Sequence, residues 1–233
     1  MVKLKVELPD ATLGVIEADG VRVESAAAEL AELIHEVSES TRRKFTLETL
    51  AESQASRAVR VMFRAWGVDP SKYRPSSEAL QRRVVQGKGL YRVSNVVDIG
   101  NLGSIETGWP FGLYDRSKIS PPVVLRHGAK SEMYEGIGKR LWHLEGRPVL
   151  ADAVGPFGSP ISDSTRTMVT ESTCDLLGVI YAPGTESEAS VQHARSVLTE
   201  RLTRFANAGA IRSGLSPLIS DPPGAHRNAD EKV

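Results

Sequence analysis

The sequence predicts an α+β protein, in which helices and strands follow one another irregularly along the chain. Two observations support this prediction. Residues 2–8 alternate apolar and charged side chains, a period of two that is typical of a strand. Residues 186–206 instead repeat apolar side chains at steps of three and four, as an amphipathic helix does. Because the two patterns do not alternate in a strict β-α-β order, the sequence disfavours a doubly wound parallel sheet.

The helix predictions rest on periodicity and on residues that begin or end helices. A long helix over residues 47–66 is expected to end at Gly67, and a shorter one is expected to begin at Ser76 and stop at Gly87. Ser94 is well placed to cap the next helix. We therefore expect helices over residues 26–37, 47–66, 76–86, from 94 onward, and 186–206.

Strands are predicted where short apolar runs are bounded by turn residues. These runs cover residues 2–8, 13–18, 121–126, 148–153 and 176–182. Residues 155–164 are rich in Gly, Pro and Ser and predict a loop. The tail, residues 211–233, has little to bury and is expected to be disordered.

Length and composition limit the class of protein. The chain has 233 residues, of which 40% are hydrophobic and 25% charged, as in a soluble domain with a substantial core. Its single cysteine excludes an internal disulfide. The first residues do not resemble a signal peptide, and no apolar run approaches the ~20 residues that span a bilayer. These features predict a cytoplasmic protein.

Familiar catalytic and cofactor motifs are missing from the sequence. The stretch "QGKGL" lacks the frame of a phosphate-binding loop, and no dinucleotide fingerprint or nucleophile elbow occurs. The five histidines do not have metal-ligand spacing, so we expect no metal and no cofactor. Cys174 precedes an apolar run and is expected to be buried. His127 is interpreted as a satisfied residue at a strand edge.

Charge is distributed unevenly, although the formal net charge is zero. Residues 1–40 contain three basic and nine acidic side chains, whereas residues 41–92 contain twelve basic and four acidic ones. A basic helical stretch of this kind either is a solvated surface or docks on a phosphate backbone. The candidate RNA contacts are Arg74, Arg82, Arg83 and Arg126; Arg126 either meets a phosphate or pairs with Asp152.

The stretch "SNVVDIGNLGSIETGWPFGLYD", residues 94–115, is the most unusual part of the chain. Trp109, Phe111 and Tyr114 cluster here, although only 6% of the residues are aromatic. Glycines lie between them, and glycine allows backbone to approach a ligand closely. The aromatic residues either pack as a core turn or line the wall of a pocket.

Five quoted stretches carry a resemblance to a known family: "VDPSKYRPSSEALQRRV", "VSNVVDIGNLGSIETGWPFGLYDRSKI", "VVLR", "VLADAVG" and "SDSTRTMVTESTCDLLGVIYA". In this order they resemble the editing and tRNA-binding domain of the phenylalanyl-tRNA synthetase beta subunit, and especially free-standing proteins made of that domain alone. The resemblance covers residues 69–182. It suggests three parts: an N-terminal strand–helix region (1–68), the editing-type domain (69–210) and the tail (211–233).

The resemblance implies a mixed, partly barrel-like sheet flanked by helices, and a site that hydrolyses the ester of a wrong amino acid on a tRNA. Asn101 matches the Asn of a family motif, Gly100 replaces its Thr, and Gly112 stands where the synthetase has His. Asp163 is the nearest match to the acid that recognises a substrate phenol. The implied catalytic residues are thus Asn101 and Asp163, and the implied substrate-binding residues are Gly100, Trp109, Phe111, Gly112, Tyr114, Arg166 and Thr167.

Three functions remain open at this point. The chain is a trans-editing factor that hydrolyses mischarged tRNA, or a module that binds tRNA, an amino acid or a similar small ligand without catalysis, or an unrelated hydrolase that uses His127 or Asp163. Aminoacylation is not expected, because the chain contains no class II synthetase motif.

Overall fold

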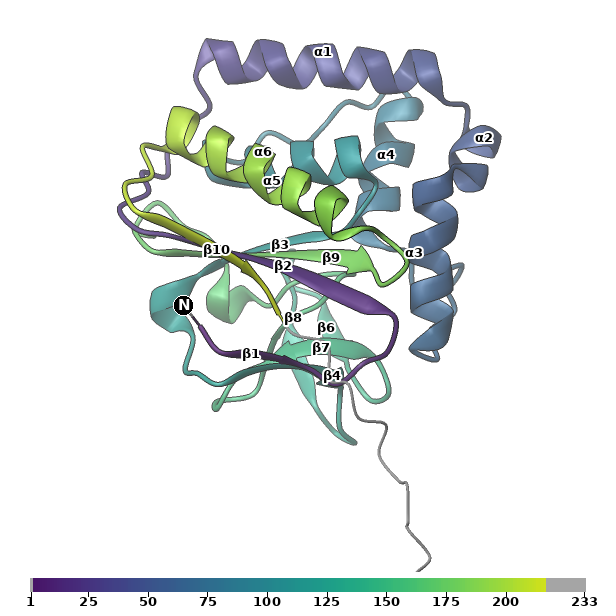
Figure 1. Ribbon diagram of the computed structural model, residues 1–233, viewed down its shortest axis with the longest axis vertical. Helices are drawn as coiled ribbons and strands as arrows, with labels where there is room; N and C mark the ends of the chain where they lie inside the picture. Colours follow the sequence, from purple (N-terminus) through teal and green to yellow (C-terminus); the bar gives the residue numbers. More distant parts are fainter. Residues whose placement is uncertain (1, 217–233) are drawn as a thin grey trace, which may run out of the picture.

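In the computed structural model, which describes residues 2–216, the chain folds into three layers (Figure 1). Helices form the first layer, one four-stranded sheet the second, and another four-stranded sheet the third. This mixture of helices with several sheets confirms the α+β prediction. No sheet among the described residues closes into a barrel.

The central sheet has the strand order β10-β2-β9-β3, and all its pairs are antiparallel. Its two inner strands, β2 (Ala11–Ala18) and β9 (Leu176–Pro183), are almost entirely buried, because helices cover one face and the second sheet lies over the other (Figure 1). Both appear in the sequence as apolar runs for this reason. The outer strands are β3 (Phe111–Asp115) and β10 (Ile211–Leu215).

The second sheet has the order β1-β4-β7-β8. Its strands are β1 (Leu4–Val6), β4 (Val123–His127), β7 (Pro148–Ala151) and β8 (Pro156–Gly158), and β1 pairs with β4 in parallel. A separate hairpin joins β5 (Met133–Glu135) to β6 (Leu141–His143). Two short 3-10 helices, η1 (Arg116–Lys118) and η2 (Thr165–Thr167), lie in the connections.

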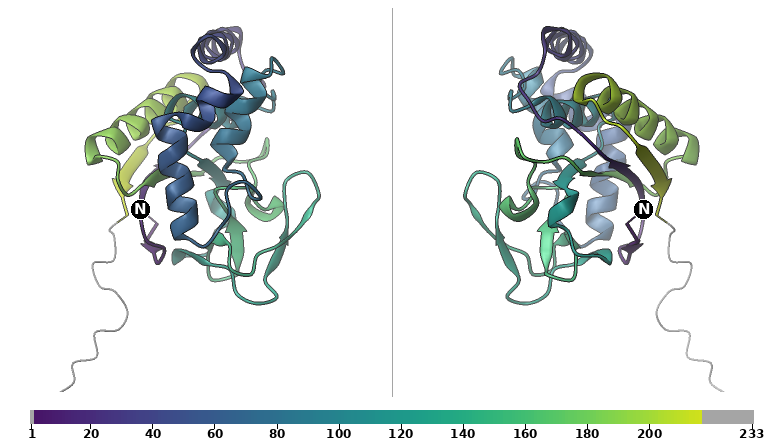
Figure 2. Two further views of the ribbon diagram at one scale, coloured as in Figure 1. Left: turned by 90° about the vertical axis from the view of Figure 1, so that its right-hand side faces the viewer. Right: turned by 90° about the vertical axis from the view of Figure 1, so that its left-hand side faces the viewer.

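Six α-helices complete the described part of the chain. They are α1 (Ala28–Lys44), α2 (Leu47–Glu52), α3 (Gln54–Ala65), α4 (Ser76–Val85), α5 (Asn95–Thr107) and α6 (Glu188–Ala206). α5 and α6 lie against the central sheet, and α3 stands beside it, reaching toward the second sheet (Figure 2). None of these helices is long and apolar enough to cross a membrane.

Helix ends explain most departures from the sequence predictions. The single helix expected over residues 47–66 is broken at Ser53, which ends α2 and whose hydroxyl accepts a hydrogen bond from Ser56 N at 3.2 Å to begin α3. Ser94 caps α5 as predicted, and α5 ends at Gly108, whose φ of 74° suits glycine. The residue that precedes α4 is Pro75, so Ser76 is its first helical residue and not its cap.

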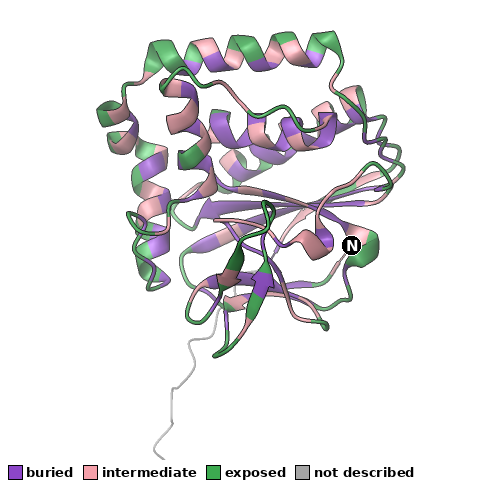
Figure 3. Ribbon diagram, turned by 180° about the vertical axis from the view of Figure 1, so that it is seen from behind, coloured by how far each residue is buried: buried purple, intermediate pink, exposed green. Residues whose placement is uncertain are grey.

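Two predictions about burial and order were wrong. Cys174 is exposed, because it lies in the turn before β9 and not within the strand. Residues 211–215 form β10, which pairs with β2 along its whole length, so this part of the expected tail is ordered. Residues 217–233 of that expected tail lie outside the described residues. Buried residues concentrate between the layers, while the outer surface of α1 is exposed (Figure 3).

Candidate functional site

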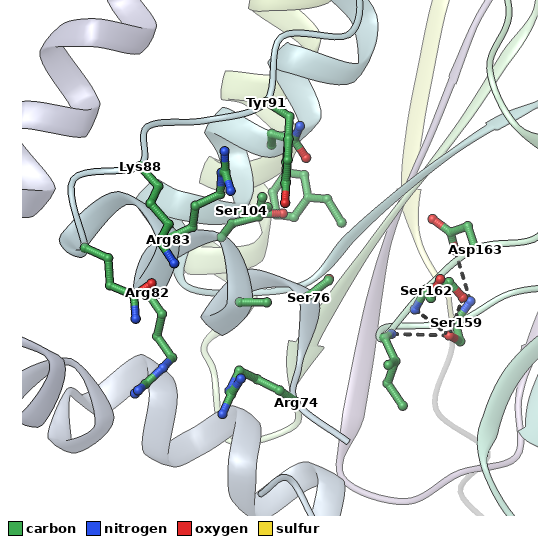
Figure 4. Close-up of a pocket in the computed structure, with 16 residues that line it drawn as sticks. Arg74, Ser76, Arg82, Arg83, Lys88, Tyr91, Ser104, Ser159, Ser162 and Asp163 are labelled. Carbon is green, nitrogen blue, oxygen red and sulfur yellow. Dashed lines mark hydrogen bonds between the residues drawn. The ribbon is translucent and has the colours of Figure 1, made fainter. Parts of the chain in front are cut away.

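A cavity of about 430 Å³ opens between α4 and the segment that follows β8. Basic side chains form one wall, and small polar residues with one carboxyl group form the other (Figure 4). We call this the basic cavity. Its lining includes Arg74, Ser76, Arg82, Arg83, Lys88, Tyr91, Asn101, Ser104, Phe111, Ser159, Ser162 and Asp163.

The basic wall consists of side chains from α4 and the segments on either side of it. Glu78, which is 3% exposed, is turned inward and pairs with Arg60 at 2.8 Å, and Arg74 lies 3.6 Å from the same carboxylate. Arg82, Arg83 and Lys88 form no salt bridge with any residue in 2–216. Because a cluster of unpaired bases attracts anions, this wall is suited to phosphate groups.

Arg83 also forms part of a stacked pair at the cavity wall. Its guanidinium lies 3.8 Å from the centre of the Tyr91 ring, a cation–π distance. The buried Nε of Arg83 has no hydrogen-bond partner within the described chain. Tyr91 is 57% exposed, so part of its ring remains available for contact. An exposed aromatic ring beside unpaired Arg and Lys side chains commonly stacks on a nucleobase of a bound nucleic acid.

The opposite wall is built by hydrogen bonds within residues 159–163. Ser159 Oγ accepts from the amides of Ile161 and Ser162 at 3.2 and 3.0 Å and donates to the carbonyl of Ser162 at 2.7 Å. Oδ1 of Asp163 accepts from Ser159 N at 3.0 Å and from the Tyr114 hydroxyl at 2.8 Å. These contacts hold the half-buried Asp163 carboxyl at the cavity, and Oδ2 has no partner among residues 2–216.

The environment of Asp163 changes its acidity. Burial raises the pKa of Asp163 to about 7, against the hydrogen bonds from Ser159 N and Tyr114, which act to lower it. A carboxyl group with a pKa near neutrality exchanges protons readily at physiological pH, as a general acid or base must. Burial and the nearby charge of Asp163 raise the pKa of Tyr114, so this phenol stays protonated as a donor.

Tyr114 does not line the basic cavity, although Phe111 and Asp163 do. The stretch predicted as an aromatic turn is the strand β3, so its side chains alternate between the two faces of the sheet. Phe111 faces the helices, whereas the fully buried Tyr114 faces the second sheet, where its ring meets Phe157 edge-on at 5.0 Å. Its hydroxyl also lies 3.2 Å from that of Tyr181.

Gly112 makes room for this tyrosine and not for a ligand. A Cβ atom at Gly112 would lie 2.1 Å from the Tyr114 hydroxyl, and one at Gly158 would lie 2.4 Å from the same oxygen. Gly100 has a comparable role on α5, because a Cβ there would meet Leu113 at 2.5 Å. Gly112 is thus required by packing within the protein, whereas Gly100 makes room for Leu113 at the wall of a second cavity.

The basic cavity brings together six residues that the sequence singled out from distant parts of the chain. They are Arg74, Arg82, Arg83, Asn101, Phe111 and Asp163. Asn101 is half-buried on α5, and its side chain has no hydrogen-bond partner in the described structure. Its amide is therefore available to a ligand.

Other predicted site residues lie elsewhere. Trp109 is buried beside a different cavity, between α5 and α6. Arg166 forms two hydrogen bonds with Asp152, at 2.9 and 3.1 Å, and the buried Thr167 contacts the backbone of β8. Arg126 pairs with Glu132 at 2.8 Å and not with Asp152, and its contact with a phosphate stays a prediction. None of these four residues lines the basic cavity.

Several residues of the cavity were not predicted from the sequence. Ser159 and Ser162 lie in the stretch predicted as a plain loop, and Ser104 lies on α5 among apolar residues. Tyr91 was detectable, since it is an aromatic residue within the basic stretch of residues 41–92. No group of three or more His, Cys, Asp or Glu side chains within residues 2–216 is arranged to hold a metal ion.

One family model and two curated proteins match this chain in sequence. A family model described as the B3/4 domain matches residues 58–216. Two phenylalanine–tRNA ligase beta subunits of Neisseria meningitidis, from serogroups A and B, are each 28% identical over 98 residues, which is 38% of this chain. The match spans only 12% of the length of these curated relatives.

A solved structure is also similar to this chain. It is an N-terminal fragment of the phenylalanyl-tRNA synthetase beta subunit from Pyrococcus horikoshii, with 18% sequence identity and a TM-score of 0.45. The similarity covers 93% of this chain and 56% of that fragment.

Proposed function

The chain belongs to the B3/4 domain family, and on that premise we propose that it binds the acceptor end of a charged tRNA in the basic cavity and hydrolyses the aminoacyl ester there. The observation that supports this proposal is that four basic side chains and one carboxyl group line a single cavity. Relatives named as phenylalanine–tRNA ligase beta subunits make tRNA the natural RNA to consider. Such a substrate would place the protein in the cytoplasm.

The basic side chains of the cavity would bind the phosphate backbone of the RNA. Arg82, Arg83 and Lys88 have no salt-bridge partner in residues 2–216, so binding a phosphate would break no existing ion pair. The exposed ring of Tyr91 would stack on a base near the RNA end. Sequence-independent contacts of this kind suit a single-stranded end, whose bases are free to stack.

The carboxyl group would act on the ester. In its ionised form Asp163 would take a proton from a water molecule while the water oxygen attacks the ester carbonyl carbon. The bond between that carbon and the ribose oxygen then breaks, and the proton passes to the ribose oxygen. A carboxylic acid and a free ribose hydroxyl result. The side-chain amide of Asn101, which also lines the cavity, would donate a hydrogen bond to the carbonyl oxygen.

A binding module without catalysis is the second candidate. It is favoured by one observation: Oδ1 of Asp163 already accepts hydrogen bonds from Tyr114 and Ser159. Gly112, at the position where the resemblance expects His, has its side-chain space filled by Tyr114. In this case the cavity would bind the charged RNA end and leave its ester intact.

Incubation with a panel of charged tRNAs distinguishes the two candidates. The wild-type protein should accelerate ester loss for at least one amino acid, and Asp163→Asn should reduce that rate by about a hundredfold while binding persists. Ester loss at the spontaneous rate for every tRNA, with binding retained, would support the module. Failure to bind any tRNA would eliminate both.

A further inference from the structure

A second cavity adjoins the basic cavity. It has a volume of about 340 Å³ and lies between α5, β3 and the segments around Ile137 and Met168. Asn101, Phe111 and Asp163 line both cavities, so they mark the junction between them. The two cavities therefore lie side by side, with these three residues between them.

The second cavity is chemically different from the first. Apart from the shared Asn101 and Asp163, every side chain that lines it is apolar, and they include Val97, Leu113 and Met168. Two further lining residues, Val93 and Ile137, are 64% and 55% exposed. Large apolar side chains exposed at the edge of a cavity favour an apolar ligand, because such a ligand removes their surface from water.

A hydroxyl group is poorly served in this cavity. The polar groups lie at the junction, and one of them, Oδ1 of Asp163, already accepts the phenolic hydroxyl of Tyr114. Tyr114 itself fills the space between the sheets beside Gly112 and Gly158, so a ligand cannot place a hydroxyl there. A phenol at the far end of a ligand side chain would lie away from the junction, among the apolar side chains of this cavity, where it would lose water without gaining a side-chain partner, which is unfavourable.

We infer that the aminoacyl group accepted by this protein has an apolar side chain without a hydroxyl, of the leucine, methionine or phenylalanine kind, and that it is held in the cavity of Val93, Val97, Leu113 and Ile137. This inference rests on the proposed function, since it assigns the amino-acid half of the same ligand. The junction residues Asn101 and Asp163 then lie beside the ester, between the nucleotide and the amino-acid side chain.

The test uses 3′-amino-3′-deoxyadenosine acylated with phenylalanine, leucine or tyrosine, in which an amide replaces the labile ester. Binding to the full-length protein is measured by calorimetry. The phenylalanine compound should bind about ten- to a hundredfold more tightly than the tyrosine compound, from which it differs by one hydroxyl. Equal affinities, or tighter binding of the tyrosine compound, would overturn the inference.

Variants at exposed positions test the location without endangering the fold. Val93→Ser combined with Ile137→Ser should weaken the phenylalanine and leucine compounds about tenfold, while Val154→Ser, at a residue 68% exposed and outside the cavity, should leave them unchanged. Unchanged affinity in the double variant would overturn the assignment to this cavity.

Binding of uncharged tRNA, measured in parallel, distinguishes failure of this inference from failure of the proposed function. If tRNA binds and the amides do not discriminate, the inference fails and the proposed function stands. If tRNA does not bind, the proposed function fails and removes the inference with it.

Discussion

The phenolic hydroxyl of Tyr114 donates a hydrogen bond of 2.8 Å to Oδ1 of Asp163, and this contact joins the buried core to the wall of the basic cavity. Tyr114 comes from β3, and Asp163 follows β8 in the other sheet. The carboxyl group that faces the cavity is therefore positioned by a residue that a ligand never touches.

Replacing Tyr114 by Phe tests this contact. The variant loses the hydrogen bonds to Asp163 and Tyr181 and should be destabilised by about 1–3 kcal/mol, because buried polar groups lose a partner. The pKa of Asp163 should rise further, since the tyrosine hydroxyl acts to lower it. Denaturant unfolding and a carboxyl titration by NMR measure the two effects. Tyr91→Phe, at an exposed residue, is the matched control.

Gly112→Ala should be strongly destabilising. The new methyl group would lie 2.1 Å from the Tyr114 hydroxyl, which forces the tyrosine from its place between the sheets. We expect a loss of about 1–3 kcal/mol or more, as for other overpacked cores. The matched control is Gly209→Ala, where the nearest atom to the new Cβ is 3.4 Å away.

A double variant checks the cause of that loss. Gly112→Ala combined with Tyr114→Leu should be less destabilised than the sum of the two single changes, because residues in contact couple. Additive effects would show that Gly112 does not serve Tyr114.

Elements with strong periodicity were the ones that the sequence predicted well. α6 and β9 were found close to their observed ends, because their apolar positions repeat without interruption. β3 was mistaken for a turn, since two of its five residues are aromatic, Gly112 interrupts them and Pro110 precedes them. Only pairing with β9 makes it a strand, and pairing over such a sequence distance is not visible in a local pattern.

The candidate site was predictable in its parts but not in its assembly. The bases of α4 and Asp163 were identified from residue type and resemblance, while their meeting in one cavity depends on the packing of distant elements. The salt bridge of Arg126 with Glu132 was not predicted, because Glu132 lies in the segment between β4 and β5, where no sequence pattern indicates a partner. Residue type alone did not distinguish an arginine held by a salt bridge from one without a partner.

The stability of the protein should depend on pH through Asp163. The native pKa of about 7 lies above the ordinary value of 3.8, so folding favours the protonated form. The stabilisation that this proton provides is present below pH 4 and is lost as pH rises through 7. Asp163→Asn should remove this loss, so the wild type should become less stable relative to the variant by a few kcal/mol (about 4 at most) between pH 4 and 8.

Denaturant unfolding of both proteins across that pH range measures the difference. Asp115 and Asp152, whose pKa values are lowered by hydrogen bonds in spite of burial, occur in both proteins and cancel. A difference that does not vary with pH would contradict the raised pKa.

Arg166→Ala should affect stability and not ligand binding. The change leaves the carboxylate of Asp152, whose side chain is fully buried, without its arginine, and we expect a loss of about 2–4 kcal/mol. Affinity for tRNA should stay within about twofold, since Arg166 does not line the basic cavity. A selective loss of tRNA affinity with unchanged stability would return Arg166 to the binding site.

The salt dependence of tRNA affinity tests the central claim most directly. The account predicts that the wild type binds tRNA more weakly as salt rises, with a steep dependence. Arg82→Glu combined with Arg83→Glu should weaken binding and flatten that dependence, by about 0.7 in logarithmic slope for each single-strand phosphate that the protein no longer neutralises. Arg57→Glu, at an exposed arginine outside the cavity, should retain the wild-type slope. If the double variant binds tRNA with the affinity and slope of the wild type, the basic cavity is not the RNA-binding surface.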